Sequence, residues 1–247
     1  KRGVGESEGD YSVATTYDFA NDARSAVRCL EYRPEINQKK IGLVGHSEGA
    51  LIAPIIAADS DEGIAFIIMM GGIGVTGAEL LLKQAEIISQ INGIPEDQIF
   101  FATETNRALY EVAVSEGNDT DLINEMKEIQ PELNDNMAGL LLSPWFRTFL
   151  AIDPDEYISK LSCPVLAMNG EKDVQCPPEQ NMPAIEQSLK KAGNTNYKVE
   201  TLPGLNHLFQ TSETGSPYEY NQLEEIMAPA ALELILNWLN GVSGGGM

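Results

Sequence analysis

The 247-residue chain is poor in basic residues, and this shortage excludes two classes of partner. Sixteen lysines and arginines stand against thirty-seven aspartates and glutamates, which gives a formal net charge of −21. A surface this acidic repels phosphate backbones and anionic lipids, so we expect no nucleic-acid partner and no membrane partner. The sequence also lacks any run of about eighteen apolar residues, so no transmembrane helix is expected.

Cysteine and histidine are equally scarce. The three cysteines are Cys29, Cys163 and Cys176, and no two of them form a CxxC pair. An odd number without such a pair favours free thiols over a disulfide framework. The two histidines, His46 and His207, are too few for a histidine-rich metal site, so no metal site is predicted.

What remains is a globular composition in which strands alternate with helices. Short unbroken apolar runs, such as KIGLVG at 40–45, are typical of strands that are buried on both faces. This alternation predicts an α/β fold with a mostly parallel sheet and helices on both faces. The predicted strands are 40–45, 64–70, 164–169 and 197–202, and the predicted helices are 16–32, 48–59, 183–192 and 229–240.

The alternation stops between residues 77 and 157, where no convincing strand occurs. Glycine- and proline-containing breaks divide this segment into four or five amphipathic helices. We therefore predict an all-helical cap at 77–157, inserted between two parts of the core at 1–76 and 158–247. The glycine-rich end, 244–247, favours a flexible tail.

The strongest motif is GHSEG at 45–49, between a predicted strand and a predicted helix. That setting is required for a nucleophile elbow, in which the turn lifts the Ser47 hydroxyl above the sheet. Gly45 and Gly49 keep the residues around the serine small. The N–H of Glu48, at the start of the helix, is the predicted first oxyanion donor. Without a strand before it and a helix after it, a GxSxG pattern can arise by chance and is weak evidence for a nucleophile elbow.

A serine hydroxyl needs a base, and the chain offers only two histidines. The His46 side chain is expected to point away from Ser47. His207 follows the last predicted strand, at the sheet edge where sites form, and is therefore the predicted base. Asp173, directly after the strand at 164–169, is the predicted acid, with Glu171 as its competitor in the same loop.

Two further features are a cysteine near Asp173 and a group of aromatic residues in the predicted cap. Cys176, three residues beyond Asp173, is expected to be a packed thiol. Trp145, Phe146 and Phe149 are equally consistent with a substrate pocket for an acyl or leaving group and with the ordinary core of the helical cap.

Four stretches resemble the serine hydrolases of the α/β-hydrolase superfamily, in the bacterial branch of dienelactone hydrolases, prolyl-oligopeptidase-like enzymes and small carboxylesterases. The resemblance implies a catalytic triad of Ser47, Asp173 and His207, an acyl-enzyme and no cofactor. The order of the three residues along the chain matches that superfamily. The stretches are RGVGESEGDYS at 2–12, KIGLVGHSEGA at 40–50, CPVLAMNGEKDVQCPPEQN at 163–181 and LPGLNHLFQ at 202–210.

In that family several strands precede the RGxGxS stretch, with which this chain begins. We therefore expect either a missing N-terminal segment or another chain, as in a homo-oligomer, to cover the edge of the strand at 40–45. No signal peptide is visible, and the natural N-terminus is expected to be absent, which leaves cytoplasmic and periplasmic locations open.

The leading prediction is a serine hydrolase, a carboxylesterase, that cleaves small-molecule esters of small or medium acyl groups. A peptidase or amidase with the same triad is one alternative. A truncated, non-catalytic module of the same fold is another.

Overall fold

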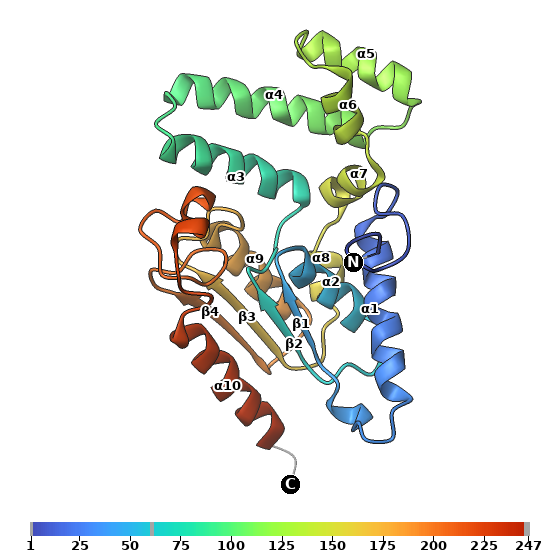
Figure 1. Cartoon of the computed structure of the whole chain (residues 1–247), viewed down its shortest axis with the longest axis vertical. Coiled ribbons are helices and arrows are strands. Elements are labelled where there is room, and N and C mark those ends of the chain that lie inside the picture. The colour runs from blue at the N-terminus through green and yellow to red at the C-terminus, as the bar shows by residue number, and fades with distance from the viewer. Residues whose placement is uncertain (1, 60–61, 245–247) are drawn as a thin grey trace. The chain divides into compact units, whose positions relative to one another are not determined.

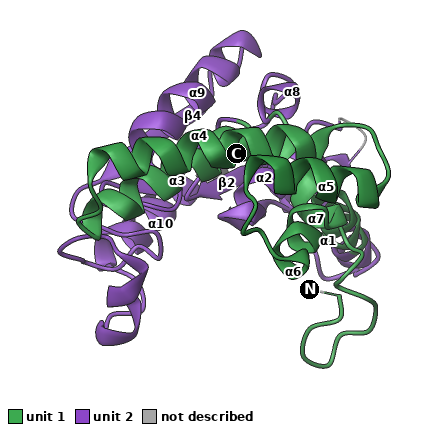
Figure 2. Ribbon diagram, turned by 90° about the horizontal axis from the view of Figure 1, so that it is seen from above, with its two compact units in different colours: residues 1–25, 76–153 green, residues 26–75, 154–247 purple. Residues whose placement is uncertain are grey.

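The structure is a computed structural model that describes residues 2–59 and 62–244 (Figure 1). It divides into two compact units, coloured in Figure 2. Unit 1 comprises residues 1–25 and 76–153, and unit 2 comprises residues 26–75 and 154–247. Of the flexible tail predicted at 244–247, position 244 is the last residue of helix α10 (Pro229–Gly244), and residues 245–247 lie outside the described residues.

Unit 2 contains a four-stranded sheet in which all neighbouring strands are parallel, as predicted. Because the strands are parallel, their carboxyl ends lie at one edge of the sheet, where Ser47, Asp173 and His207 follow. In spatial order the strands are β1 (Leu43–His46), β2 (Ile67–Met70), β3 (Val165–Gly170) and β4 (Tyr197–Leu202).

Helices cover both faces of this sheet, which confirms the predicted layering. Successive side chains of a strand point to opposite faces, so β2 contributes Ile67 and Met69 to one core and Ile68 and Met70 to the other. The first core is covered by α2 (Glu48–Ala57), α8 (Asp155–Ile158) and α9 (Pro178–Lys191), and the second by α10 (Pro229–Gly244).

The strand predicted at 40–45 is displaced along the chain and is less buried than expected. Residues Gln38–Lys40 form the 3₁₀ helix η1, because the Asn37 side chain accepts a hydrogen bond from the Lys39 N–H at 3.1 Å. The strand therefore begins at Leu43. The prediction that this strand is buried on both faces is wrong, because Val44 is 60% exposed at the edge of the described sheet. The expected cover for this edge stays a prediction.

Helix α9 also begins earlier than the predicted residue 183. Pro178 occupies its first turn, where a proline costs no intrahelical hydrogen bond, and Pro183 lies inside the helix. The remaining helix of the first part is α1 (Thr16–Glu31), which begins with reciprocal hydrogen bonds between Thr15 and Asp18, as in a capping box.

The segment at 77–157 is helical, as predicted, with six helices in place of the expected four or five. Five of them belong to unit 1, and α3 and α4 lie side by side within it (Figures 1 and 2). They are α3 (Gly77–Ile91), α4 (Glu96–Val114), α5 (Asp119–Ile129), α6 (Asp135–Leu141) and α7 (Pro144–Ala151).

Side-chain caps explain where several of these helices begin. The Thr76 side chain accepts from the Glu79 N–H in a complete capping box before α3. Asn118, Asn134 and Ser143 accept in the same way from the N–H three residues later, before α5, α6 and α7. Of the described helices, none combines the length and apolarity that crossing a membrane requires.

Candidate active site

Ser47 lies on a sharp turn between β1 and α2, with φ 56° and ψ −119°. Few residues other than glycine adopt a positive φ, so this turn stores backbone strain. The turn is held by the Ser47 N–H, which donates to the Met70 carbonyl at 2.9 Å. Such a strained strand-to-helix turn is the geometry of a nucleophile elbow.

The two glycines of the motif differ in what they permit. A Cβ at Gly45 would lie 1.9 Å from the Gly49 carbonyl oxygen, so only glycine fits at position 45. A Cβ at Gly49 would have no described atom within 4 Å, apart from its chain neighbours and the backbone of its own helix. The expectation that position 49 must stay small is therefore wrong. The turn needs one glycine and not two.

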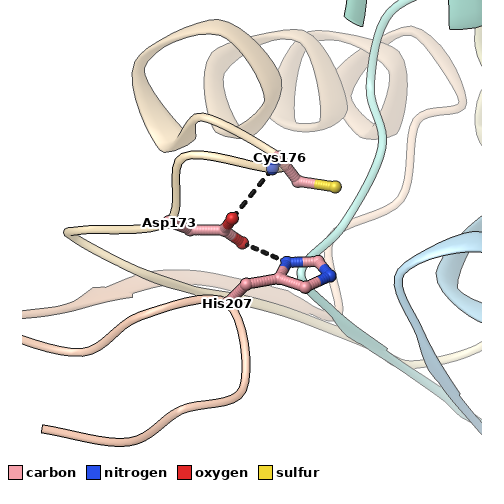
Figure 3. A group of neighbouring side chains, drawn as sticks. All are labelled: Asp173, Cys176 and His207. Atoms are coloured by element: carbon pink, nitrogen blue, oxygen red, sulfur yellow. Dashed lines mark hydrogen bonds and ion pairs between the residues drawn. The ribbon is translucent and has the colours of Figure 1, made fainter. Parts of the chain in front are cut away.

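Asp173 and His207, which are 34 residues apart in the chain, form a buried hydrogen-bonded pair (Figure 3). His207 Nδ1 and Asp173 Oδ2 are 2.8 Å apart, and the two side chains are 4% and 0% exposed. The other carboxylate oxygen, Oδ1, accepts from the N–H groups of Gln175 at 2.9 Å and Cys176 at 2.8 Å. An ionised carboxylate is thus satisfied without water, and Nδ1 must carry the proton that joins the pair.

The loop that carries His207 is held by its neighbours. The Asn206 side-chain oxygen accepts from the N–H groups of Leu208 and Gln210, each at 2.9 Å. Phe209 is fully buried and has φ 60°, a strained value that its packing maintains. The imidazole is therefore carried by a loop with few alternative conformations.

Glu171, the competing carboxylate, does not contact His207 through any hydrogen bond of the described residues. It is exposed, and its Oε2 accepts from the Gly204 N–H at 2.8 Å. Glu171 thus links the loops that follow β3 and β4, whereas Asp173 faces the imidazole. Asp173, and not Glu171, is therefore the hydrogen-bonded partner of His207 among the described residues, and its role as the catalytic acid stays a prediction.

The Ser47 hydroxyl lies close enough to the Cys176 sulfur to favour the charged form of the thiol, although burial outweighs this effect. Among the described residues no direct hydrogen bond joins Ser47 to His207. Cys176 is 2% exposed and, as expected, packed. Burial, together with the nearby Asp173 carboxylate, raises the pKa of this thiol well above its usual range. Cys176 is therefore a neighbour both of Ser47 and of Asp173, and its position three residues after Asp173 was the only sequence signal for this.

Two more contacts around His207 were missed by sequence reasoning. The Nε2 of His46 lies 2.8 Å from the His207 carbonyl oxygen, so Nε2–H donates, and the two ring centroids are 4.5 Å apart. Partial burial lowers the pKa of His46. On another side, a Cβ at Gly71 would lie 3.0 Å from His207 Cε1, and Gly71 has φ +59°. The glycine pair at 71–72, which marks the end of β2, was the available signal.

The remaining predicted residues lie as follows. Glu48 is the first residue of α2, directly after Ser47, at the positive end of the helix dipole. Trp145, Phe146 and Phe149 belong to α7 in unit 1. Trp145 stacks on Phe149 at a centroid distance of 5.2 Å, and Phe146 packs against Tyr110 at 5.6 Å. Their contact with an acyl group stays a prediction.

A parallel sheet with helices on both faces, a serine on a strained turn and a buried acid–histidine pair at the same sheet edge define an α/β hydrolase. Residues 24–212 match the family described as BAAT / Acyl-CoA thioester hydrolase C terminal. This match covers most of the chain, so the protein belongs to that family. The chain therefore has the α/β-hydrolase fold and belongs to a family whose description names acyl-CoA thioester hydrolysis.

Solved structures show the same fold at low sequence identity. An esterase of Pyrococcus furiosus matches with a TM-score of 0.52 and 13% identity, over 96% of this chain and 66% of that chain. A thermophilic esterase from Thermogutta terrifontis matches with a TM-score of 0.50 and 19% identity, over 98% and 78%.

A relative by sequence is an uncharacterised 31.7 kDa protein from the traX–finO intergenic region of Escherichia coli. It is 26% identical over 184 residues, which are 72% of this chain and 62% of that protein. The match therefore spans less than two thirds of the relative's length.

Proposed function

We propose that the protein is a serine hydrolase that cleaves carboxylic esters of small or medium acyl groups through an acyl-enzyme. The observation that carries this proposal is the buried 2.8 Å hydrogen bond between His207 Nδ1 and Asp173 Oδ2. A carboxylate in this position fixes the tautomer that leaves Nε2 as a base and stabilises the imidazolium that forms. The strained turn that presents Ser47 supplies the nucleophile.

In the proposed reaction, Ser47 Oγ attacks the ester carbonyl while His207 Nε2 takes the hydroxyl proton. The bond to the leaving alkoxide then breaks, and His207 returns the proton to that alkoxide. Water, deprotonated by His207, attacks the acyl-enzyme, which releases the acid and restores Ser47. We assign the Glu48 N–H, at the start of α2, to the negative oxygen of the tetrahedral intermediate.

Among the described residues Ser47 makes no hydrogen bond to His207, so this cycle requires the Ser47 hydroxyl to turn toward His207. Hydrogen bonds of a catalytic site are often long or absent without substrate and tighten in the complex. The contact between Ser47 and Cys176 is therefore compatible with a resting state of the proposed enzyme.

Thioesters are the second candidate substrate class, and the family description favours them. The same steps apply, with a thiolate as the leaving group. We place neutral esters first because an acyl-CoA carries several phosphate charges, and a chain with a net charge of −21 repels them. Amide cleavage by the same three residues remains the alternative within enzymes, and a non-catalytic module remains the alternative outside them.

The test compares three substrates that share one acyl group: a p-nitrophenyl ester, an acyl thioester and a p-nitroanilide. Wild type and Ser47→Ala are measured side by side, and release of nitrophenol, thiol or nitroaniline is followed. We expect the ester to be turned over fastest and Ser47→Ala to be inactive. Faster turnover of the thioester or of the anilide would replace the proposed substrate class and keep the mechanism.

A fluorophosphonate probe separates the enzyme from a non-catalytic module. An activated Ser47 becomes covalently labelled, and Ser25→Ala, which changes an exposed serine of α1, labels like wild type. A folded wild-type sample that neither labels nor turns over any of the three substrates would overturn the proposed function.

A further inference from the structure

Asp173, Cys176 and His207 are three buried side chains that each offer a metal-ligating atom. The three ligating atoms all lie within 4.8 Å of one another. Figure 3 shows the Cys176 sulfur and the His207 imidazole extending in the same direction from Asp173. The three residues come from the two loops after β3 and β4, within unit 2. Sequence spacing alone showed no cysteine–histidine cluster, because His207 is 31 residues from Cys176.

The chemistry of this set suits a thiophilic divalent cation. Zinc is bound by thiolate sulfur at about 2.3 Å and by imidazole nitrogen or carboxylate oxygen at about 2.0–2.2 Å, in tetrahedral sites. Ligand atoms in such a site are about 3–4 Å apart, so atoms of the cluster that are 4.8 Å apart must approach by roughly 1–2 Å. Ser47 is a neighbour of Cys176, so its hydroxyl oxygen or a water can take the fourth position.

Charge balance supports the same conclusion. The Asp173 carboxylate is buried, and within the part of the chain that the structure describes it accepts only from neutral N–H groups when His207 is neutral. A divalent cation with one carboxylate and one thiolate gives a site with no net charge, so no uncompensated charge is buried. The Cys176 thiol gives up its proton to solvent as the metal–sulfur bond forms, and His207 binds as the neutral imidazole.

We propose that Asp173, Cys176 and His207 bind one thiophilic divalent cation, such as Zn²⁺ or Cd²⁺, and that the bound cation inhibits the enzyme. Binding occupies the proposed base and the carboxylate that orients it, so neither is free to act on Ser47. The inhibition rests on the proposed function, whereas the binding does not.

The binding test uses Cd²⁺ as the probe and the ultraviolet charge-transfer absorption of a cadmium–thiolate bond as the readout. In the variant Cys29→Ser/Cys163→Ala, Cys176 is the only thiol of the chain. We expect one equivalent of Cd²⁺ to saturate the absorption in this variant. Adding Cys176→Ala to the same background is expected to abolish it, and adding His207→Ala is expected to weaken binding by about ten-fold or more.

The inhibition test titrates Zn²⁺ against ester hydrolysis and then restores activity with a chelator. For each variant, activity is expressed relative to its own zinc-free rate. We expect Cys176→Ala to need at least about ten-fold more Zn²⁺ than wild type for half-inhibition, and Cys29→Ser to match wild type.

The two tests fail separately. If the folded single-thiol variant shows no cadmium–thiolate absorption, the cation site is overturned, whatever the activity. If that absorption appears but the protein hydrolyses nothing, the site stands and the proposed function fails. If the enzyme is active but Cys176→Ala is as sensitive to Zn²⁺ as wild type, the inhibition is overturned.

Discussion

The two halves of the candidate site are held in place by different means. Asp173 and His207 have side chains that are 0% and 4% exposed, and hydrogen bonds fix the orientation of each. Ser47 follows β1, an edge strand of the described sheet, and depends on backbone strain and on the close approach of Gly45 to Gly49. Burial positions the acid and the base, whereas chain geometry positions the nucleophile. Side-chain changes and backbone changes should therefore damage the two halves differently.

The largest effect is expected for Ser47→Ala, which removes the nucleophile and keeps the turn. Loss of this hydroxyl should lower kcat/KM for the ester by about 10⁴- to 10⁶-fold, because the imidazole then has no group to activate. The free energy of unfolding should change by no more than about 0.5 kcal/mol, as expected for a half-buried side chain whose backbone stays in place. Kinetics and urea unfolding of the same sample check both statements. An active Ser47→Ala would show that the elbow does not supply the nucleophile.

The second-largest effect is expected for Asp173→Asn, which should lower kcat by about 10⁴-fold and leave the structure nearly unchanged. An amide cannot stabilise the imidazolium, and its NH₂ group favours the wrong tautomer of His207. The matched control is Glu171→Gln, which makes the same change two residues away, where the carboxylate meets the Gly204 N–H instead of His207. We expect the control to retain activity within about two-fold. Equal losses in the two variants would remove Asp173 from its proposed role.

A pair of glycine variants tests the other half of the comparison. Gly45→Ala places a Cβ 1.9 Å from the Gly49 carbonyl oxygen, so it should destabilise the protein by about 1–3 kcal/mol or more and distort the elbow. Gly49→Ala adds a methyl group where there is room, in the first turns of α2, and should be neutral or stabilising by up to about 1 kcal/mol. Denaturant unfolding of both variants measures the difference. Equal destabilisation would show that the turn needs both glycines.

The same comparison explains how much of the molecule could be predicted from its sequence. The runs IIMM and VLAMN predict β2 and β3, because strands buried on both faces are apolar along most of their length. The positions of Ser47, Asp173 and His207 then follow from the rule that sites gather at the carboxyl ends of parallel strands. Local sequence was sufficient to predict the position of a residue that directly follows the end of a strand.

Contacts that depend on loop conformation were not predictable in this way. His46 contacts the His207 carbonyl across 161 positions of sequence, and Cys176 is a neighbour of Ser47 although the two are far apart in the chain. The His207 loop itself requires a φ of 60° at Phe209, a value that phenylalanine rarely adopts and that the sequence therefore does not predict. The exposure of Val44 likewise depends on which strands flank β1 and not on β1 itself.

The smallest expected effect concerns His46, which joins the two halves through its hydrogen bond to His207. Partial burial lowers the pKa of His46 below its usual 6.5, so between these values the unfolded chain binds more protons than the folded one. The stabilisation that the neutral ring provides is therefore present above about pH 6.5 and is lost as pH falls through the lower folded pKa.

His46→Gln keeps an N–H donor for the His207 carbonyl and removes this titration. We expect the free energy of unfolding of the variant to fall less steeply than that of wild type below about pH 6.5, with the two curves nearly parallel at higher pH. Ester hydrolysis at pH 8 should fall by only about two- to five-fold, because the change reaches His207 through its backbone alone. Urea unfolding at a series of pH values measures the slopes. Identical slopes below pH 6.5 would mean that His46 titrates alike in the folded and unfolded chain, and the expected pH dependence would be wrong.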